Sequence, residues 1–91
     1  MKIEFDPAKS EKNEEERGLP FSRAGEFYWD TALIAEDLRK LYSERRFEGI
    51  GYIEDRLHVV VFAKIAGGIR VISFRKANGR EEVRYAKKTQ S

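Results

Sequence analysis

The sequence predicts an α+β domain in which helices come first, an antiparallel β-meander follows, and one more helix closes the chain. Three observations predict this order. Asp6-Pro7 opens a polar stretch that stops at Gly18, as a capped helix would. Between residues 46 and 75, three apolar segments rich in β-branched residues are separated by turn residues. Asn78 and Glu81 have the spacing of a capping box, which predicts a last helix.

Length and composition limit the kinds of protein that the chain can be. Its 91 residues suit a single domain spanning residues 1–91. The chain has no cysteine and one histidine, which excludes disulfides and the usual zinc sites, so we expect no metal and no cofactor. The first ten residues lack the apolar run of a signal peptide, and no stretch has membrane-spanning length, so we expect a cytoplasmic protein.

Two local signals define the first elements. Met1–Phe5 alternates apolar and polar residues, as a short strand does. The first helix then begins with Asp6 as its N-cap, because proline is favoured at the first helical position. It ends at Arg17, where Gly18 is a natural C-cap.

Residues 19–45 are less clearly patterned. Ser22 can cap a second helix, and its apolar stripe would be Ala24, Phe27 and Tyr28. Thr31–Glu36 is ambiguous between helix and strand, and we favour a strand. Residues 38–44 form a polar linker. We expect the aromatic side chains here to belong to the core rather than to a platform that stacks on bases; they are Phe27, Tyr28 and Trp29.

The meander consists of three strands. The first two, Arg46–Ile53 and Leu57–Ile65, flank a turn at residues 54–56. Gly67-Gly68 predicts a two-residue turn, because both positions tolerate positive φ, and Ile69–Arg75 follows as the third strand. The last helix continues through Lys88.

These turns predict the register of the sheet. Arg46 would face Lys64 in the first hairpin, and Lys64 would face Val71 in the second. Ile53 would face Leu57, and Ala66 would face Ile69. The core face would carry Phe47, Ile53, Leu57, Val59, Val61, Ile65, Ile72 and Phe74, with Arg70 as an exception near the turn. The opposite face would carry Arg46, Glu48, Tyr52, His58, Lys64, Ser73 and Arg75 among Ile50, Val60, Phe62 and Val71.

Charge is unevenly distributed along the chain. Residues 1–45 carry 8 Lys/Arg and 11 Asp/Glu, whereas residues 46–91 carry 10 and 5. Two cations opposed across strands, Arg46 and Lys64, repel each other unless an anion lies between them. A cationic sheet face with interspersed aromatic rings suits RNA, although a merely lopsided surface or an acidic protein partner fits the charge as well.

Spacings at both ends of the chain resemble one protein family. Asp6, Lys9, Asn13, Gly18 and Phe21 resemble the opening of BrnT-type toxins, D-P-x-K-x-x-x-N-x-x-x-x-G-x-x-F. The segment RVIS at residues 70–73 resembles the start of the family's pattern R-I-I-S-x-R-x-A-x-x-x-E-x-x-x-Y, which continues through Arg75, Ala77, Glu81 and Tyr85. Arg46 and Gly51 fall where the family has its R-x-x-x-x-G strand.

This resemblance implies a fold and an activity. It implies a RelE-like fold, metal-independent cleavage of RNA that inhibits translation, and a ribbon-helix-helix antitoxin that neutralises the toxin. Operator DNA would be bound only through that antitoxin. The chain departs from the family at Glu16-Arg17, where Lys-His is common, and at Ile65, where arginine is frequent.

Metal-free RNA cleavage uses the 2′-hydroxyl as the nucleophile, so the protein must remove a proton and stabilise charge on phosphate. The planar guanidinium of arginine suits phosphate. We therefore expect Arg46 and Arg75 to bind phosphate with help from Lys64. Glu48 is the preferred general base and His58 the less favoured one. The expected RNA-binding residues are Arg46, His58, Lys64, Arg75 and Arg80.

Each assignment has a structural alternative. His58 could be a solvated histidine near a turn, and Glu48 could be the ion-pair partner of Arg46 or Lys64. Arg70 is expected to pair with an acid from the N-terminal half, and Tyr85 to pack its helix. For the whole chain, the alternatives to a nuclease are a degenerate toxin relative that only binds an antitoxin, and a nucleic-acid-binding domain without cleavage.

Overall fold

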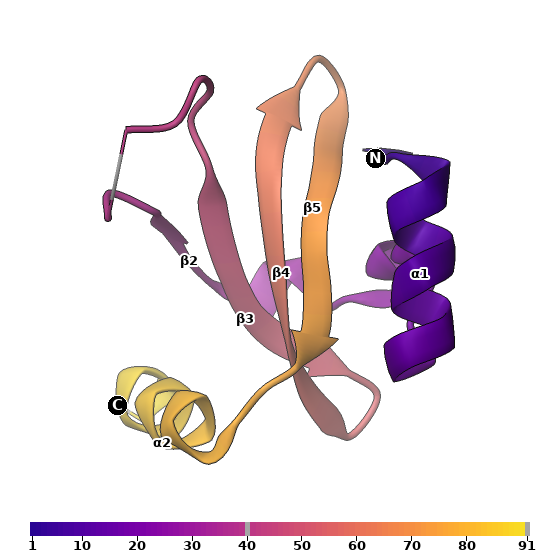
Figure 1. Ribbon diagram of the computed structural model, residues 1–91. Coiled ribbons are helices and arrows are strands. Elements are labelled where there is room, and N and C mark those ends of the chain that lie inside the picture. Colours follow the sequence, from indigo (N-terminus) through magenta and orange to yellow (C-terminus); the bar gives the residue numbers. More distant parts are fainter. Residues whose placement is uncertain (40, 91) are drawn as a thin grey trace.

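The computed structural model describes residues 1–39 and 41–90, and it has the predicted α+β architecture (Figure 1). A short strand, a helix and two 3₁₀ helices precede the main strands, and a helix follows them. The helices are α1 (Pro7–Arg17), η1 (Phe21–Glu26), η2 (Trp29–Thr31) and α2 (Gly79–Thr89). The strands are β1 (Lys2–Glu4), β2 (Leu33–Glu36), β3 (Phe47–Ile53), β4 (Arg56–Ile65) and β5 (Gly68–Lys76).

All five strands form one sheet in the order β1-β5-β4-β3-β2. Strands β2 to β5 are antiparallel neighbours, as the predicted meander requires, whereas β1 is parallel to β5. β1 pairs with Gly68, Ile69 and Arg70, so within residues 1–39 and 41–90 the rest of β5 has no strand on that side. Helix α1 runs alongside this part of β5, and α2 lies at the opposite side of the sheet (Figure 1).

The first helix has the predicted caps and a buried anchor. Asp6 accepts a hydrogen bond from the Ala8 amide, and Gly18 adopts a left-handed φ of 70° that few other residues tolerate. Near the middle of the helix, Asn13 is buried and donates to the carbonyl oxygens of Leu19 and Phe74 at 2.7 and 2.9 Å. This one amide therefore ties α1 to β5.

The expected second helix is instead a 3₁₀ helix, η1, that begins at Phe21 after Pro20 and has no side-chain cap, so the assignment of Ser22 is wrong. Extended backbone at Phe27 ends the helical period. Phe27 is buried as expected, but Tyr28 is 49% exposed and does not belong to the core. Trp29 packs edge-on against Phe27 and Phe62, as a core residue.

Both hairpin turns differ by one residue from those predicted. The β3–β4 turn is Glu54-Asp55, with Glu54 at φ 53°, so Ile53 pairs with Arg56 rather than with Leu57. The β4–β5 turn uses Gly67 at φ 77° and pairs Ile65 with Gly68, so Ala66 does not pair with Ile69. The predicted register is therefore wrong, because the first turn is one residue shorter than expected and the second lies one position earlier.

The shifted register changes which face each residue of β4 occupies. Val60 and Phe62 lie in the main core, while Leu57 and Val59 lie under α2 on the other face. The main core, between the sheet and η1, contains Leu19, Phe21, Ala24, Phe27, Phe47, Ile53, Val60, Phe62, Ile69, Val71 and Phe74. The second cluster contains Ile50, Leu57, Val59, Ala77 and Tyr85. The predicted core face is thus correct for Phe47, Ile53 and Phe74 but wrong for β4.

Candidate functional site

The face of the sheet that carries α2 also gathers three of the six site residues expected from the sequence, Arg46, Glu48 and Arg75. Its cross-strand rows join Ile50 to Val59 and Arg75, Glu48 to Val61 and Ser73, and Ala63 to Arg70. Arg46 immediately precedes β3 and, by strand alternation, projects to the same side as Glu48. We call Arg46, Glu48, Arg70, Ser73 and Arg75 the arginine face.

A β-bulge brings Arg70 onto this face. The register of β4 and β5 shifts between Val61 and Phe62, so Ser73 pairs with Val61 while Val71 pairs with Phe62. Without that shift Arg70 and Arg75, five residues apart, would point to opposite faces. The bulge therefore supplies a third arginine, which was expected beside the core face.

Arg75 is the most firmly positioned of the three arginines. Its Nη1 and Nη2 atoms each donate to one carboxylate oxygen of Glu81 at 2.7 Å. The hydrogen bonds from Arg75 lower the pKa of Glu81, and the Glu81 carboxylate raises the pKa of Arg75. Glu81 is also the N3 residue of the α2 capping box, in which the Asn78 side chain accepts from the Glu81 amide. The start of α2 thus orients the arginine.

Glu48 is half-buried, and its ion-pair partner is Arg84 of α2 at 3.2 Å, rather than Arg46 or Lys64. Because Arg84 is an exposed side chain, this contact can be exchanged for another without disturbing the core. Neither Arg84 nor Ser73 was singled out from the sequence as a site residue. The cap at Asn78 predicts the helix, but only the packing angle of α2 places Arg84 above the sheet.

The segment before β3 covers the other end of the arginine face. The guanidinium of Arg46 stacks 4.4 Å from the Tyr42 ring centroid, and its buried Nε atom has no hydrogen-bond partner within residues 1–39 and 41–90. Arg70 forms an ion pair with Glu44. The expectation that Arg70 pairs with an acid from the N-terminal half is confirmed, although Arg70 lies on the arginine face rather than beside the core.

Lys64 and His58 lie on the opposite face, so the predicted opposition of Arg46 and Lys64 is wrong. Lys64 places its ammonium 4.4 Å from the ring centroid of Phe47, a residue of the main core. His58 is 4% exposed, rather than solvated, and its Nδ1 lies 2.8 Å from the Arg56 carbonyl oxygen. Burial, with a smaller effect of nearby cations, lowers the pKa of His58.

Two further candidates lie on α2. Tyr85 is buried, packs edge-on against Tyr52, and donates to the Thr31 carbonyl oxygen at 3.0 Å, so its predicted packing role is confirmed. Arg80 is exposed in the first turn of the helix, next to the capping box. The helix therefore combines one anchor in the second cluster with cations near the arginine face.

The described residues have neither a metal-ligand cluster nor a membrane-spanning helix. Within residues 1–39 and 41–90, no three His, Asp or Glu side chains are grouped so that they could hold a metal ion. No helix in the same ranges is both long and apolar enough to cross a membrane. The chemistry available on the arginine face is that of three guanidinium groups, one carboxylate and one hydroxyl.

One comparison with known proteins gives a match. The family model described as a ribonuclease toxin, BrnT, of a type II toxin-antitoxin system matches residues 5–81. Among curated proteins and among solved structures, none matches the chain. The matched range begins before α1 and ends at Glu81, so it includes the entire sheet except β1 and the whole arginine face. The chain therefore belongs to the BrnT family of ribonuclease toxins of type II toxin-antitoxin systems.

Proposed function

We propose that this chain is a metal-independent endoribonuclease that acts in the cytoplasm, inhibits translation, and is neutralised by a ribbon-helix-helix antitoxin, through which alone it would bind operator DNA. One observation carries the proposal. Three arginines, Arg46, Arg70 and Arg75, lie on one face of the sheet together with Glu48. This combination can supply a general base and stabilise charge on phosphate, the two functions that cleavage through the 2′-hydroxyl needs.

The proposed reaction begins with loss of the 2′-hydroxyl proton of RNA to Glu48. The 2′-oxygen then attacks the adjacent phosphorus, the bond to the 5′-oxygen breaks, and that oxygen takes up a proton from a water molecule as it leaves, while the resulting hydroxide is neutralised by the proton that Glu48 releases. The products are a 2′,3′-cyclic phosphate and a 5′-hydroxyl end. Negative charge that develops on the non-bridging phosphate oxygens is stabilised by the arginines, and Arg75 can donate to them through the N–H groups that its contact with Glu81 leaves free.

The surroundings of each group support these roles. Glu81 holds Arg75 in a fixed orientation, which reduces the rearrangement needed when phosphate binds. Glu48 lies between the Arg46 and Arg75 rows, and its contact with exposed Arg84 can yield to substrate. In this register Lys64 and His58 lie outside the reacting centre, so we assign the chemistry to the arginine face. We leave phosphate contacts outside that face to the exposed side chains of Lys64 and Arg80, because His58 is buried.

A non-catalytic antitoxin-binding module is the second candidate. It is favoured by the pairing of Arg70 with Glu44, Arg75 with Glu81 and Glu48 with Arg84, which leaves these charges compensated without RNA. A surface of compensated charges is what an interface needs and is less ready for phosphate.

Induced expression in a bacterial host distinguishes the two candidates. We expect growth arrest with cleaved RNA, and rescue when the neighbouring antitoxin gene is co-expressed. Arg75→Ala and Glu48→Gln should abolish arrest and still bind the antitoxin, whereas Lys87→Ala, an exposed change on the same helix as Arg84, should behave like the wild type. Purified protein should cleave RNA in excess chelator. Normal growth with intact RNA, from soluble folded protein, would leave the binding module.

A further inference from the structure

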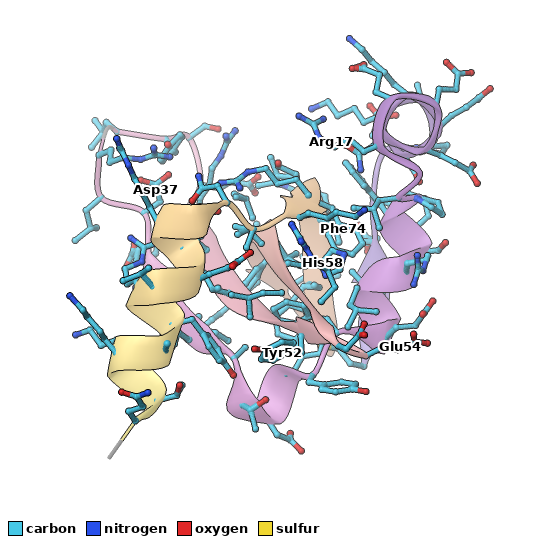
Figure 2. All side chains as sticks on the ribbon, turned by 90° about the horizontal axis from the view of Figure 1, so that it is seen from below. Arg17, Asp37, Tyr52, Glu54, His58 and Phe74 are labelled. Carbon is cyan, nitrogen blue, oxygen red and sulfur yellow. The ribbon has the colours of Figure 1, made fainter. Side chains whose placement is uncertain are left out.

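A second basic surface lies at the end of the sheet, on the side away from the arginine face. It is a hollow of about 400 Å³ between the end of α1, the β3–β4 turn and the last residue of β5. Figure 2 views this end of the molecule and shows Arg17 and His58 between the strands and α1, on the other side from α2. The lining residues are Arg17, Gly18, Leu19, Arg23, Ile53, Glu54, Asp55, Arg56, His58 and Lys76; we call this the basic hollow.

Cations outnumber acids in the basic hollow. Four Arg or Lys side chains face two carboxylates, Glu54 and Asp55. Arg23 is neutralised, because it forms two hydrogen bonds of 3.1 Å with Glu26 and also experiences the charge of Glu54. The positive charge available to a ligand therefore comes from the other three cations, Arg17, Arg56 and Lys76.

These three cations retain hydrogen-bond donors. One Nη of Arg17 donates to Asn13 at 3.3 Å, and one Nη of Arg56 donates to the Ala77 carbonyl oxygen at 3.1 Å, out of the five N–H groups that each guanidinium carries. Lys76 is exposed at the end of β5. Arg17, Arg56, His58 and Lys76 all line the same hollow, and the charges of Arg23, Arg56 and Lys76 reach His58. The three cations therefore lie around one hollow rather than at separate places on the surface.

The basic hollow is continuous with the arginine face. A smaller hollow of about 280 Å³ is lined by Arg17, Leu19, Arg75 and Lys76. It shares three of these residues with the basic hollow, and its fourth, Arg75, belongs to the arginine face. Neighbouring residues of a strand point to opposite faces, so Arg75 and Lys76 place a side chain on each side of the end of β5, and Lys76 adds positive charge there beyond the Arg75–Glu81 ion pair. In the part of the chain that the structure describes, no strand pairs with this end of β5 on its outer side.

We infer that the basic hollow binds backbone phosphates of the single-stranded RNA that flanks the cleaved bond. The inference rests on the proposed nuclease function. The RNA chain would leave the reacting centre at Arg75, pass Lys76 and Arg17 around the end of β5, and enter the basic hollow on the opposite face of the sheet. A cationic groove that follows the backbone is the usual means of binding single-stranded nucleic acid without reading its sequence.

The salt dependence of RNA binding tests this inference. We would compare Arg17→Gln/Lys76→Gln with Lys12→Gln/Lys87→Gln, which removes the same charge from exposed positions outside the hollow. The probe is an RNA of about ten nucleotides with a deoxyribose at the mapped cut site, so that it binds without being cleaved. The association constant for RNA falls as salt rises, so a plot of its logarithm against the logarithm of the salt concentration has a negative slope. Between about 50 and 200 mM salt, the first variant should make this slope less steep by about 1.4, or about 0.7 per lost phosphate contact. The control should keep the slope of the wild type.

Cleavage of two substrates gives an independent readout. The hollow variant should raise KM for the longer RNA, but it should leave cleavage of a dinucleotide that spans the cut site unchanged. Slower cleavage of both substrates would place Arg17 and Lys76 at the reacting centre. It would overturn the inference that the basic hollow binds the RNA flanking the cleaved bond. If Arg17→Gln unfolds the protein through its contact with Asn13, Lys76→Gln alone gives the same comparison with about half the change in slope.

The remaining outcomes separate this inference from the function on which it rests. Equal slopes for the hollow variant and its control, in a protein whose wild type binds and cleaves RNA, would overturn the inference and leave the nuclease intact. A wild type that neither binds nor cleaves RNA would remove the proposed function and the inference together.

Discussion

Arg75 and Glu81 show how a single carboxylate can serve both the fold and the site. Glu81 accepts two hydrogen bonds from Arg75 and a third from the Asn78 amide at 2.9 Å. The first two orient a guanidinium on the arginine face, and the third closes the capping box of α2. Glu81 is therefore a positioning residue in the proposed reaction, because it acts through Arg75.

Glu81→Gln separates the two roles. Glutamine also serves at the third position of a capping box, so the melting temperature should change little. The charge-assisted contact with Arg75 is lost, and such bonds are about twice as strong as neutral ones, so we expect kcat to fall about tenfold. Glu82→Gln, an exposed change in the same turn, is the control. An increase in kcat would mean that Glu81 competes with phosphate for Arg75.

Two glycines of β3 differ sharply in the space around them. A Cβ added at Gly51 would lie 2.7 Å from Cζ of Phe27 and 3.0 Å from Cβ of Ala32, whereas at Gly49 the nearest atom, in Phe62, would be 3.6 Å away. Gly51→Ala should therefore lower the free energy of unfolding by about 1–3 kcal/mol. Gly49→Ala should have little effect in the same urea titration. Equal effects would contradict the close packing of Phe27 against β3.

At the scale of single elements, local signals predicted the two α-helices well but not the 3₁₀ helix η1. The caps at Asp6, Gly18 and Asn78 depend on residues only a few positions away, and α1 and α2 have the expected bounds to within about a residue. Register depends instead on which turn residue adopts positive φ and on a bulge, and neither leaves a clear local pattern. Arg46, Glu48 and Arg75 were correctly placed on one face, because the predicted sides of β3 and of the end of β5 match the structure. The predicted register of β4 was off by one residue, so His58 and Lys64 were assigned to the wrong face.

The docking of α1 depends on Asn13, which offers a prediction at this scale. Its amide group is the donor to two carbonyl oxygens, those of Leu19 and Phe74, and it is buried. Asn13→Ala would leave both acceptors without that donor, so the free energy of unfolding should fall by about 1–3 kcal/mol in chemical denaturation. Lys12 is the exposed neighbour of Asn13 in α1, and Lys12→Ala should leave the free energy of unfolding nearly unchanged. A neutral Asn13→Ala would show that solvent replaces the amide and that α1 is held by other contacts.

For the molecule as a whole, unequal coverage of the sheet determines where function can reside. One face is covered by η1 and the main core, while the other is covered by α2 at one end and by the segment before β3 at the other. The arginine face occupies the part between them, which the short α2 leaves accessible. The covered face also contains a buried histidine. His58 lies at the end of this face, next to Phe74, and lines the basic hollow.

His58 should make stability depend on pH near neutrality. Burial lowers its pKa from the ordinary value of 6.5 in the folded state, so the unfolded chain takes up a proton first. Above about pH 6.5 the residue is neutral in both states and contributes nothing to the pH dependence. As the pH falls below that value, the free energy of unfolding should decrease by at most about 1.4 kcal/mol per unit, until the folded protein is protonated as well.

Carboxylates cause a second, separate decrease in the free energy of unfolding at lower pH. The pKa of Glu81 lies below its ordinary value of 4.5 because of Arg75, so its contribution disappears only as the pH falls below that range. Urea denaturation at about pH 7.5, 6.5 and 5.5 isolates the histidine from these groups. The free energy of unfolding of His58→Leu should stay constant across this pH interval, whereas that of the wild type should decrease as the pH falls. A wild type whose stability does not change would mean that the imidazole is hydrated in the folded state, and that the basic hollow reaches deeper into the sheet than the packing of His58 against Phe74 allows.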